Sequence, residues 1–88
     1  MDEQVRAQVE QLHATPLMGV VAATGGGSQA IGWLLGVPGA SRTVIEVLVP
    51  YSEGALRELI GHTPEKNVSP GTARRMAEAA YKRARKFG

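Results

Sequence analysis

Three consecutive glycines, Gly25, Gly26 and Gly27, follow an apolar run and Thr24, and a segment of helical character begins at Ser28. Glycine lets the backbone approach a ligand closely and adopt positive φ angles. A helix that starts after such a turn offers unpaired N–H groups, and its dipole favours phosphate or carboxylate. The stretch therefore predicts an anion site. A tight strand-to-helix turn without a ligand explains it equally well, because three glycines in a row fit no strict nucleotide motif.

Three hydroxyl side chains near predicted strand ends are further candidates. Ser28 could supply a nucleophile beside the glycines, although a serine there more commonly caps the helix. Tyr51 follows the second apolar run and could donate a hydrogen bond to a ligand or only pack against its neighbours. Ser52 is expected to cap the next helix. We take Ser28 and Tyr51 as catalytic candidates, and Ser52, with Thr24 and the glycines, as substrate-binding candidates.

Glu46 is the one charged residue within the second apolar run. A buried carboxylate needs a partner, and Arg42 and Arg57 are candidates for that role. If Glu46 instead faced a pocket, burial would raise its pKa and the carboxylate could act as a base. Both interpretations are open at this point.

Composition narrows the classes of function. The chain has 88 residues, which is one domain or part of one. It has no cysteine, and its two histidines lie beside predicted turns, so neither a metal site nor a cofactor is expected. No apolar run approaches the roughly 20 residues that span a bilayer, and the acidic N-terminus has no signal-peptide core behind it. These features predict a cytoplasmic protein without a membrane partner.

The formal net charge of +2 is unevenly distributed. The last twenty residues contain one acidic side chain, Glu78, and six basic ones: Arg74, Arg75, Lys82, Arg83, Arg85 and Lys86. Such an end could contact nucleic acid, but a basic run is more often the solvated face of a helix. We therefore do not expect a nucleic-acid partner.

The apolar pattern predicts the order helix, strand, helix, strand, helix, helix. The helices are expected at residues 3–13, 28–35, 52–60 and 69–87, and the strands at residues 18–23 and 43–49. Both strands are apolar on both faces, which is typical of a parallel sheet covered on both sides. A strand–helix–strand unit forms a parallel pair. We predict an α/β fold: a partial three-layer α/β/α sandwich with a small, mainly parallel sheet.

Two helices have stripes that should pack on this sheet. In the helix at 28–35 the buried side chains are expected to be Ala30, Ile31, Leu34 and Leu35. The last helix has a narrow stripe rich in alanine, which allows close packing: Ala73, Met76, Ala77, Ala80, Ala84 and Phe87. Two strands are too few for an independent sheet, so a sheet edge should lie open. We expect a single domain over residues 1–88 that self-associates or is a fragment or short half of a larger α/β domain.

Several motifs occur together in one order. They are Thr24-Gly25-Gly26, Val37-Pro38-Gly39-Ala40-Ser41, Tyr51-Ser52, and Val68-Ser69 followed by Ala73, Met76 and Ala77. Together they resemble the C-terminal domain of the CinA (competence/damage-inducible) family, also known as nicotinamide mononucleotide amidohydrolase. The similarity runs from about Val20 to the last helix. It implies an α/β sandwich, frequently oligomeric, that hydrolyses the carboxamide of a pyridine nucleotide and continues with further strands.

The chain departs from this family at its catalytic positions. Family members usually read ESCTGG at the first loop, with the serine as nucleophile, and YSNxxK after the second strand. Here the glutamate and serine positions hold Val21 and Ala22, and the asparagine and lysine positions hold Glu53 and Leu56. The resemblance thus implies binding of a pyridine nucleotide or similar phosphorylated molecule without the standard catalytic serine and lysine. The alternative is a non-catalytic interaction module that self-associates.

Overall fold

The computed structural model describes residues 1–88 and contains a two-stranded parallel sheet with helices around it. The strands are β1 (Gly19–Ala22) and β2 (Val44–Leu48), with Val20 opposite Glu46 and Ala22 opposite Leu48. The helices are α1 (Glu3–His13), α2 (Ser28–Gly36), α3 (Ala40–Thr43), α4 (Glu53–Ile60) and α5 (Pro70–Phe87), and a 3₁₀ turn, η1 (Gly25–Gly27), precedes α2.

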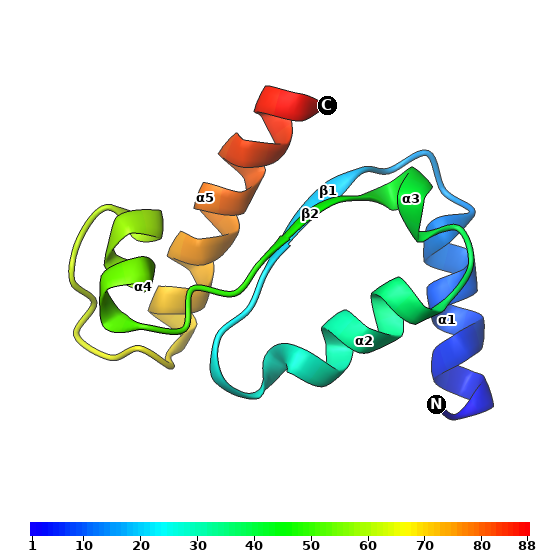
Figure 1. The fold of residues 1–88 in the computed structure, drawn as a ribbon, viewed down its shortest axis with the longest axis horizontal. Coiled ribbons are helices and arrows are strands. Elements are labelled where there is room, and N and C mark those ends of the chain that lie inside the picture. The colour runs from blue at the N-terminus through cyan, green and yellow to red at the C-terminus, as the bar shows by residue number, and fades with distance from the viewer.

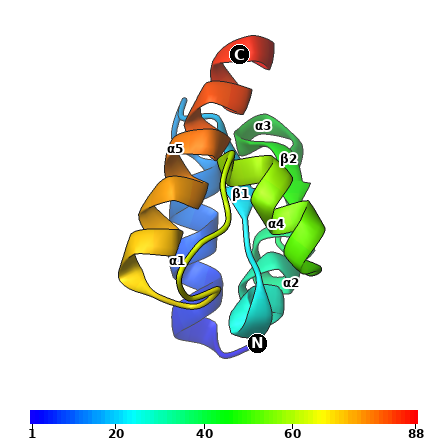
Figure 2. The same ribbon diagram turned by 90° about the vertical axis from the view of Figure 1, so that its left-hand side faces the viewer.

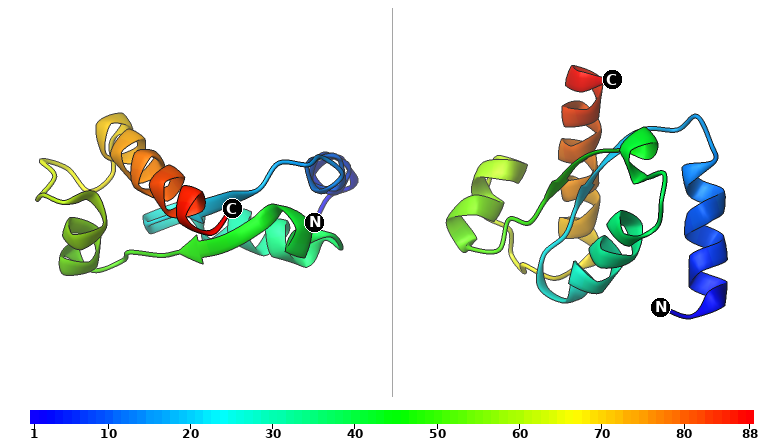
Figure 3. Two further views of the ribbon diagram at one scale, coloured as in Figure 1. Left: turned by 90° about the horizontal axis from the view of Figure 1, so that it is seen from above. Right: turned by 45° about the vertical axis from the view of Figure 1, so that its right-hand side comes forward.

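The elements form three layers. In Figure 1 the two strands overlap, and α5 lies on one side of the pair while α2 lies on the other. The view from above in Figure 3 separates the strands, with α5 on the β1 side of the molecule. Figure 2 shows α4 beside α5. The predicted partial α/β/α sandwich with a small parallel sheet is therefore confirmed.

Helix ends follow local capping chemistry. The side chains of Asp2, Ser52 and Ser69 accept hydrogen bonds from backbone N–H groups in the first turns of α1, α4 and α5. Gly61 ends α4 with a left-handed φ of 86°, and its N–H donates to the carbonyl of Arg57. The cap predicted at Ser52 is confirmed, and the last helix begins after Ser69, within the predicted range.

The corner between α2 and β2 is built around His13, a side chain that is only 1% exposed. Its Nε2–H donates to the carbonyl oxygen of Leu34 at 2.8 Å, and its Nδ1 is hydrogen-bonded to the hydroxyl of Thr43 at 2.6 Å. Because a carbonyl oxygen can only accept, Nε2 carries a proton. A single ring thus joins α1 to the end of α2 and to α3.

The Val37–Ser41 segment completes this corner. Val37 is 1% exposed, and Gly39 adopts a φ of 101° immediately before α3. A Cβ on Gly39 would lie 2.7 Å from Nη2 of Arg42 and 3.2 Å from Cβ of His13. The guanidinium of Arg42 in turn donates to the carbonyl oxygen of His13. The short helix α3, which the sequence did not predict, follows from this turn.

Burial in α2 differs from the prediction. Ile31 and Leu34 are half-buried, but Ala30 and Leu35 are exposed, and α2 has no fully buried residue. The reason is that α2 packs against β2, α1 and α3, which leaves part of its apolar stripe without a neighbour.

The whole chain has more surface than a folded protein of its mass normally has. The accessible area is 6140 Å², whereas a compact monomer of this mass exposes about 5,000 Å². Only nine residues are buried, and every residue of both strands is just half-buried. The large apolar side chains left exposed include Leu17, Met18, Val49 and Tyr81. The accessible area thus exceeds that of a compact monomer of this mass by about 1,100 Å².

Gly39→Ala should lower the free energy of unfolding by about 1–2 kcal/mol, because a side chain at this left-handed φ is strained. Chemical denaturation monitored by circular dichroism measures the change. Gly32→Ala is the matched control: it lies within α2 with no atom within 4 Å of a new Cβ, so stability should stay or rise by up to about 1 kcal/mol. Equal stability of the Gly39 variant and the wild type would contradict the role assigned to the turn.

Candidate functional site

The glycine turn lies directly after β1, at the carboxyl end of the parallel pair. Thr24 is extended, Gly25 has a φ of 70°, and the three glycines form one 3₁₀ turn that leads into α2. Gly27 is the N-cap of α2, and Ser28 is its first residue with no capping hydrogen bond. The predicted cap at Ser28 is therefore wrong. Because η1 leads directly into α2, the capping position is Gly27 and Ser28 is already the first residue of the helix.

A groove of about 280 Å³ lies beside this turn. Its lining comes from the end of β1, the glycine turn, the connector before α5, and α5 itself: Ala22, Ala23, Thr24, Gly27, Asn67, Val68, Ser69, Ala73 and Met76. Ligands of parallel α/β sheets bind beyond the carboxyl ends of the strands, and the groove lies at that place. Its volume is near the lower end of ordinary small-molecule sites.

The first N–H groups of the glycine turn lie next to the groove. Gly25 and Gly26 begin η1, where the first N–H groups of a helix have no partner within it, and neither donates a backbone hydrogen bond outside the helices and strands. The Thr24 side chain makes no capping bond. A Cβ on Gly27 would lie 2.9 Å from Cβ of Ala23, so only glycine allows this close approach. The turn thus presents N–H groups in a geometry that a side chain would disturb.

A second, larger hollow of about 540 Å³ adjoins the groove at Ser69. It is lined by polar residues of the connector and of the start of α5, among them Lys66 and Arg75. The groove has no charged lining residue. The charged residues of the neighbouring hollow are Lys66, Arg75 and the acidic Glu65. The hydroxyl of Ser69 is engaged in capping, since it accepts from the N–H of Thr72 at 3.1 Å.

Tyr51 and Ser52 lie away from this groove. Tyr51 is 78% exposed after β2 and does not line the groove. The oxygen of Ser52 accepts from the N–H of Ala55 at 3.1 Å and so caps α4. Ser28 is exposed, and its hydroxyl makes no hydrogen bond to a histidine or carboxylate. Of the residues predicted for the site, Thr24 and Gly27 line the groove, whereas Gly25, Gly26, Ser28, Tyr51 and Ser52 do not.

A search of solved structures finds a match over most of this chain. The chain is similar to the crystal structure of the competence/damage inducible protein CihA from Agrobacterium tumefaciens, with a TM-score of 0.70 and 31% sequence identity. The alignment covers 94% of this chain and 54% of that one, so the chain spans about half the length of the solved relative. A scan against protein-family models and a search of curated proteins find no match.

The fold is CinA-like. Two of the positions at which the sequence was expected to depart from the family motif can be located. Leu56 is a side chain of α4 that is only 1% exposed and does not line the groove. Ala22 lines the groove and offers only a methyl group.

Residues Asn67, Val68 and Ser69 also line the groove, although this role was not predicted. The Val68-Ser69 step is part of the resemblance, and Ser69 has the signature of a helix cap. Their proximity to the glycine turn, some forty residues earlier, depends on how α5 packs against β1. No local pattern in the sequence carries that information.

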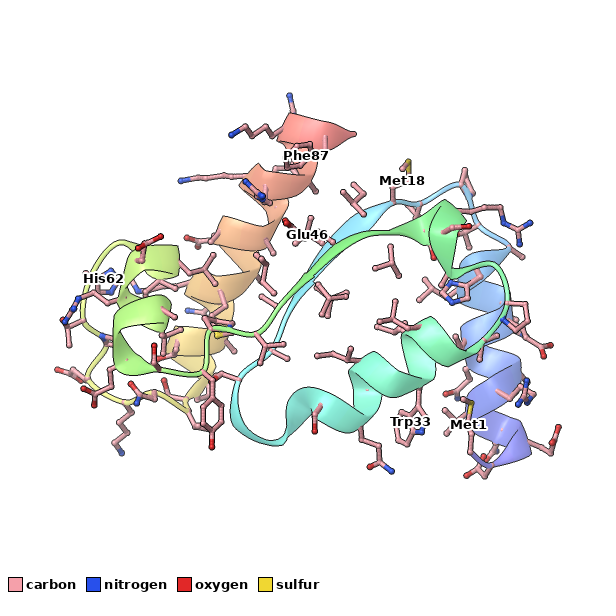
Figure 4. All side chains as sticks on the ribbon, viewed as in Figure 1. Met1, Met18, Trp33, Glu46, His62 and Phe87 are labelled. Atoms are coloured by element: carbon pink, nitrogen blue, oxygen red, sulfur yellow. The ribbon has the colours of Figure 1, made fainter.

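The sequence suggested Arg42 or Arg57 as the partner of Glu46. In the structure Glu46 pairs instead with Arg83 of α5. The guanidinium donates from Nε to Oε1 at 2.6 Å and from Nη2 to Oε2 at 3.0 Å. Figure 4 shows Glu46 between the strands and α5. The hydrogen bonds from Arg83 hold the pKa of Glu46 below its usual value. The carboxylate therefore anchors α5 to β2 and is not a general base.

No group of three His, Cys, Asp or Glu side chains is arranged to hold a metal ion. No helix has both the length and the apolar character that crossing a membrane requires.

The Glu46–Arg83 pair predicts a loss of stability in acid. Because the pKa of Glu46 is lowered in the folded state, its stabilisation is complete above the ordinary value of 4.5 and is lost as pH falls through the folded-state pKa. Melting temperatures should be measured from about pH 7 to about pH 3, an interval that includes the ordinary pKa of a carboxyl group. They should fall more steeply for the wild type than for Glu46→Gln.

Glu78→Gln is the control for this measurement, because Glu78 lies exposed on α5 and makes no ion pair. Its melting temperatures should follow the wild-type pH profile. If Glu46→Gln also reproduced that profile, the pair would not contribute to stability.

Proposed function

We propose that the chain binds a pyridine nucleotide or another phosphorylated small molecule in the groove between the glycine turn and the start of α5. The observation that carries the proposal is the pair of N–H groups at Gly25 and Gly26, which begin η1 beyond the carboxyl end of β1 and have no partner outside the helices and strands. The resemblance to the CinA family names the class of ligand.

Two helix N-termini support an anionic ligand. α2 begins at Ser28 directly after the turn, and α5 begins at Pro70 next to the lining residue Ser69. Each helix start carries a partial positive charge from its aligned peptide dipoles. Both therefore favour a phosphate in the same groove, and in the adjoining hollow the cations Lys66 and Arg75 outnumber the carboxylate of Glu65.

The other walls suit a less polar part of a ligand. Val68, Ala73 and Met76 give the groove an apolar side opposite the glycine turn. A ligand with a phosphate at the turn and a planar ring on this side would match the division between polar and apolar lining.

We further propose that this chain does not hydrolyse the ligand. Amide hydrolysis needs an activated nucleophile and a group that carries protons. Ala22 and Leu56 offer neither, and Ser28 has no hydrogen-bonded base. By resemblance the domain belongs with the amidohydrolases, but the proposed activity of this chain is binding alone.

A titration with nicotinamide mononucleotide, followed by nuclear magnetic resonance of ¹⁵N-labelled protein, tests the proposal. Amide signals of residues 25–28 and 67–69 should shift, with a dissociation constant on the order of a millimolar or tighter. Nicotinamide riboside, which lacks the phosphate, should produce much smaller shifts. The protein should release no ammonia from the nucleotide.

Gly27→Ala should weaken binding about tenfold or more, because the new methyl group would collide with Ala23 and displace the turn. Gly36→Ala, at the other end of α2 with open space around it, should bind as the wild type does. An absence of shifts at residues 25–28 with several millimolar nucleotide would refute the binding proposal.

Self-association is the second candidate function. The observation that favours it is the excess of exposed surface, about 1,100 Å² above that of a compact monomer. A module whose two strands are only half-buried gains hydrophobic stabilisation when another surface covers them.

A further inference from the structure

The hollow that adjoins the groove at Ser69 is larger and more polar than the groove itself. Its volume is about 540 Å³, nearly twice the 280 Å³ of the groove, and its lining consists of polar residues, glycine and proline. All of these residues come from one continuous stretch, His62 to Arg75, which includes the connector after α4 and the first turns of α5. The shape of the hollow therefore depends on how this stretch folds against itself.

Hydrogen bonds hold the connector against α5 inside the hollow. The Thr72 hydroxyl donates to the carbonyl oxygen of Lys66 at 2.5 Å, and the Ser69 hydroxyl donates to the oxygen of Thr72 at 3.1 Å. The oxygen of Ser69 also accepts from the N–H of Thr72. Both hydroxyls are thus used within the protein, and Thr72 is only 5% exposed. These bonds fix the backbone of Lys66 beside α5 and leave ligand binding to other side chains.

Two cations of the lining have no ionic partner. Lys66 lies on the connector and Arg75 on α5, and both are exposed. The carboxylate of Glu65 lines the same hollow but pairs with neither of them, because the salt bridge of this chain joins Arg83 to Glu46. The hollow therefore has cations in excess, and no group of the protein neutralises them.

We propose that the hollow binds a phosphate group, separate from the phosphate proposed at the glycine turn. Arginine suits phosphate because its planar guanidinium donates two parallel hydrogen bonds, and lysine adds a compact charge. A phosphate has three strongly accepting oxygens and about two negative charges, which match the unpaired Lys66 and Arg75. A carboxylate, with a single charge, would leave one of the two cations unmatched.

This phosphate can belong to the ligand of the groove or to a separate molecule. A Cβ on Gly25 would lie 3.8 Å from Cγ2 of Val68, so the glycine turn lies against the same connector that carries Lys66. Ser69 lines both cavities. A pyridine nucleotide with a diphosphate would place its second phosphate in the hollow, whereas free phosphate would bind there alone. The first source rests on the proposed function, and the second is independent of it.

A titration of the whole ¹⁵N-labelled chain with inorganic phosphate, followed by nuclear magnetic resonance, tests the hollow by itself. Amide signals of residues 62–66 and 71–75 should shift, with a dissociation constant on the order of a few millimolar. The shifts should shrink at about 0.5 M sodium chloride, because salt screens exposed charges. A titration with sodium chloride alone is the control for ionic strength.

Three variants test which side chains bind the phosphate. Arg75→Gln should raise the dissociation constant about threefold or more, since it removes one of the two cations. Arg74→Gln is the matched control: Arg74 is exposed on the same helix and has the same charge, but it does not line the hollow. Glu65→Gln should lower the dissociation constant about twofold, because it removes the one carboxylate of the lining.

Nicotinamide adenine dinucleotide, a pyridine nucleotide with a diphosphate, distinguishes the two sources. If one ligand fills both cavities, the dinucleotide should shift residues 25–28 together with residues 62–66 and 71–75, and Arg75→Gln should weaken its binding more than that of nicotinamide mononucleotide. If the phosphate is separate, inorganic phosphate should shift the hollow while the mononucleotide occupies the groove. Either result supports a second phosphate site.

The outcomes for the hollow and for the groove are independent. If neither inorganic phosphate nor the dinucleotide produced shifts in the hollow that depend on Arg75, the second phosphate site would be overturned, even with nicotinamide mononucleotide bound at residues 25–28. If phosphate shifted the hollow while neither nucleotide shifted residues 25–28, the hollow would stand and the proposed function of the groove would fail.

Discussion

The hydrogen bonding between β1 and β2 is the interaction on which every other contact in this molecule depends. The pair separates two groups of helices: α1, α2 and α3 on one side, and α4 and α5 on the other. Each group packs on the strands and on its own members. Without the strand pair, neither the glycine turn nor the start of α5 would have a fixed position.

Two strands impose a constraint that the helices cannot remove. Each strand has one neighbouring strand and one open edge. Backbone groups alternate between the two edges, so those that point to the open edge have no strand partner. The helices cover the faces of the sheet but not its edges. The high accessible area and the half-buried strands are the result. The exposed surface beside the strands therefore follows from the two-stranded topology. It is apolar because the strands consist mainly of apolar residues.

Features that depend on neighbouring residues could be predicted from the sequence. Proline and serine at the start of α5, serine before α4 and glycine after it all mark helix ends by local hydrogen bonding. The parallel pair followed from apolar strands joined through a helix. Ser28 was misplaced because the glycines form a helical turn themselves, and the stripe of α2 was overestimated because its burial depends on which elements reach it.

Contacts between distant residues could not be predicted in this way. Glu46 was expected to need a cation, which is correct, but Arg83 lies 37 residues away, beyond the nearer candidates. His13 was read as a turn residue, yet its ring lies in the core because Thr43 and Leu34 satisfy both nitrogens. The glycine turn was visible as a possible site. The opposite wall, Asn67–Ser69, required the packing of α5 on β1.

The walls of the proposed ligand groove belong to different groups of helices. The glycine turn leads into α2, whereas Asn67–Ser69 lead into α5. A molecule bound between them would bridge the two halves of the fold and would be released when they separate. By mass action, occupancy would then be linked to unfolding, so that ligand concentration itself would set how long the two halves remain joined.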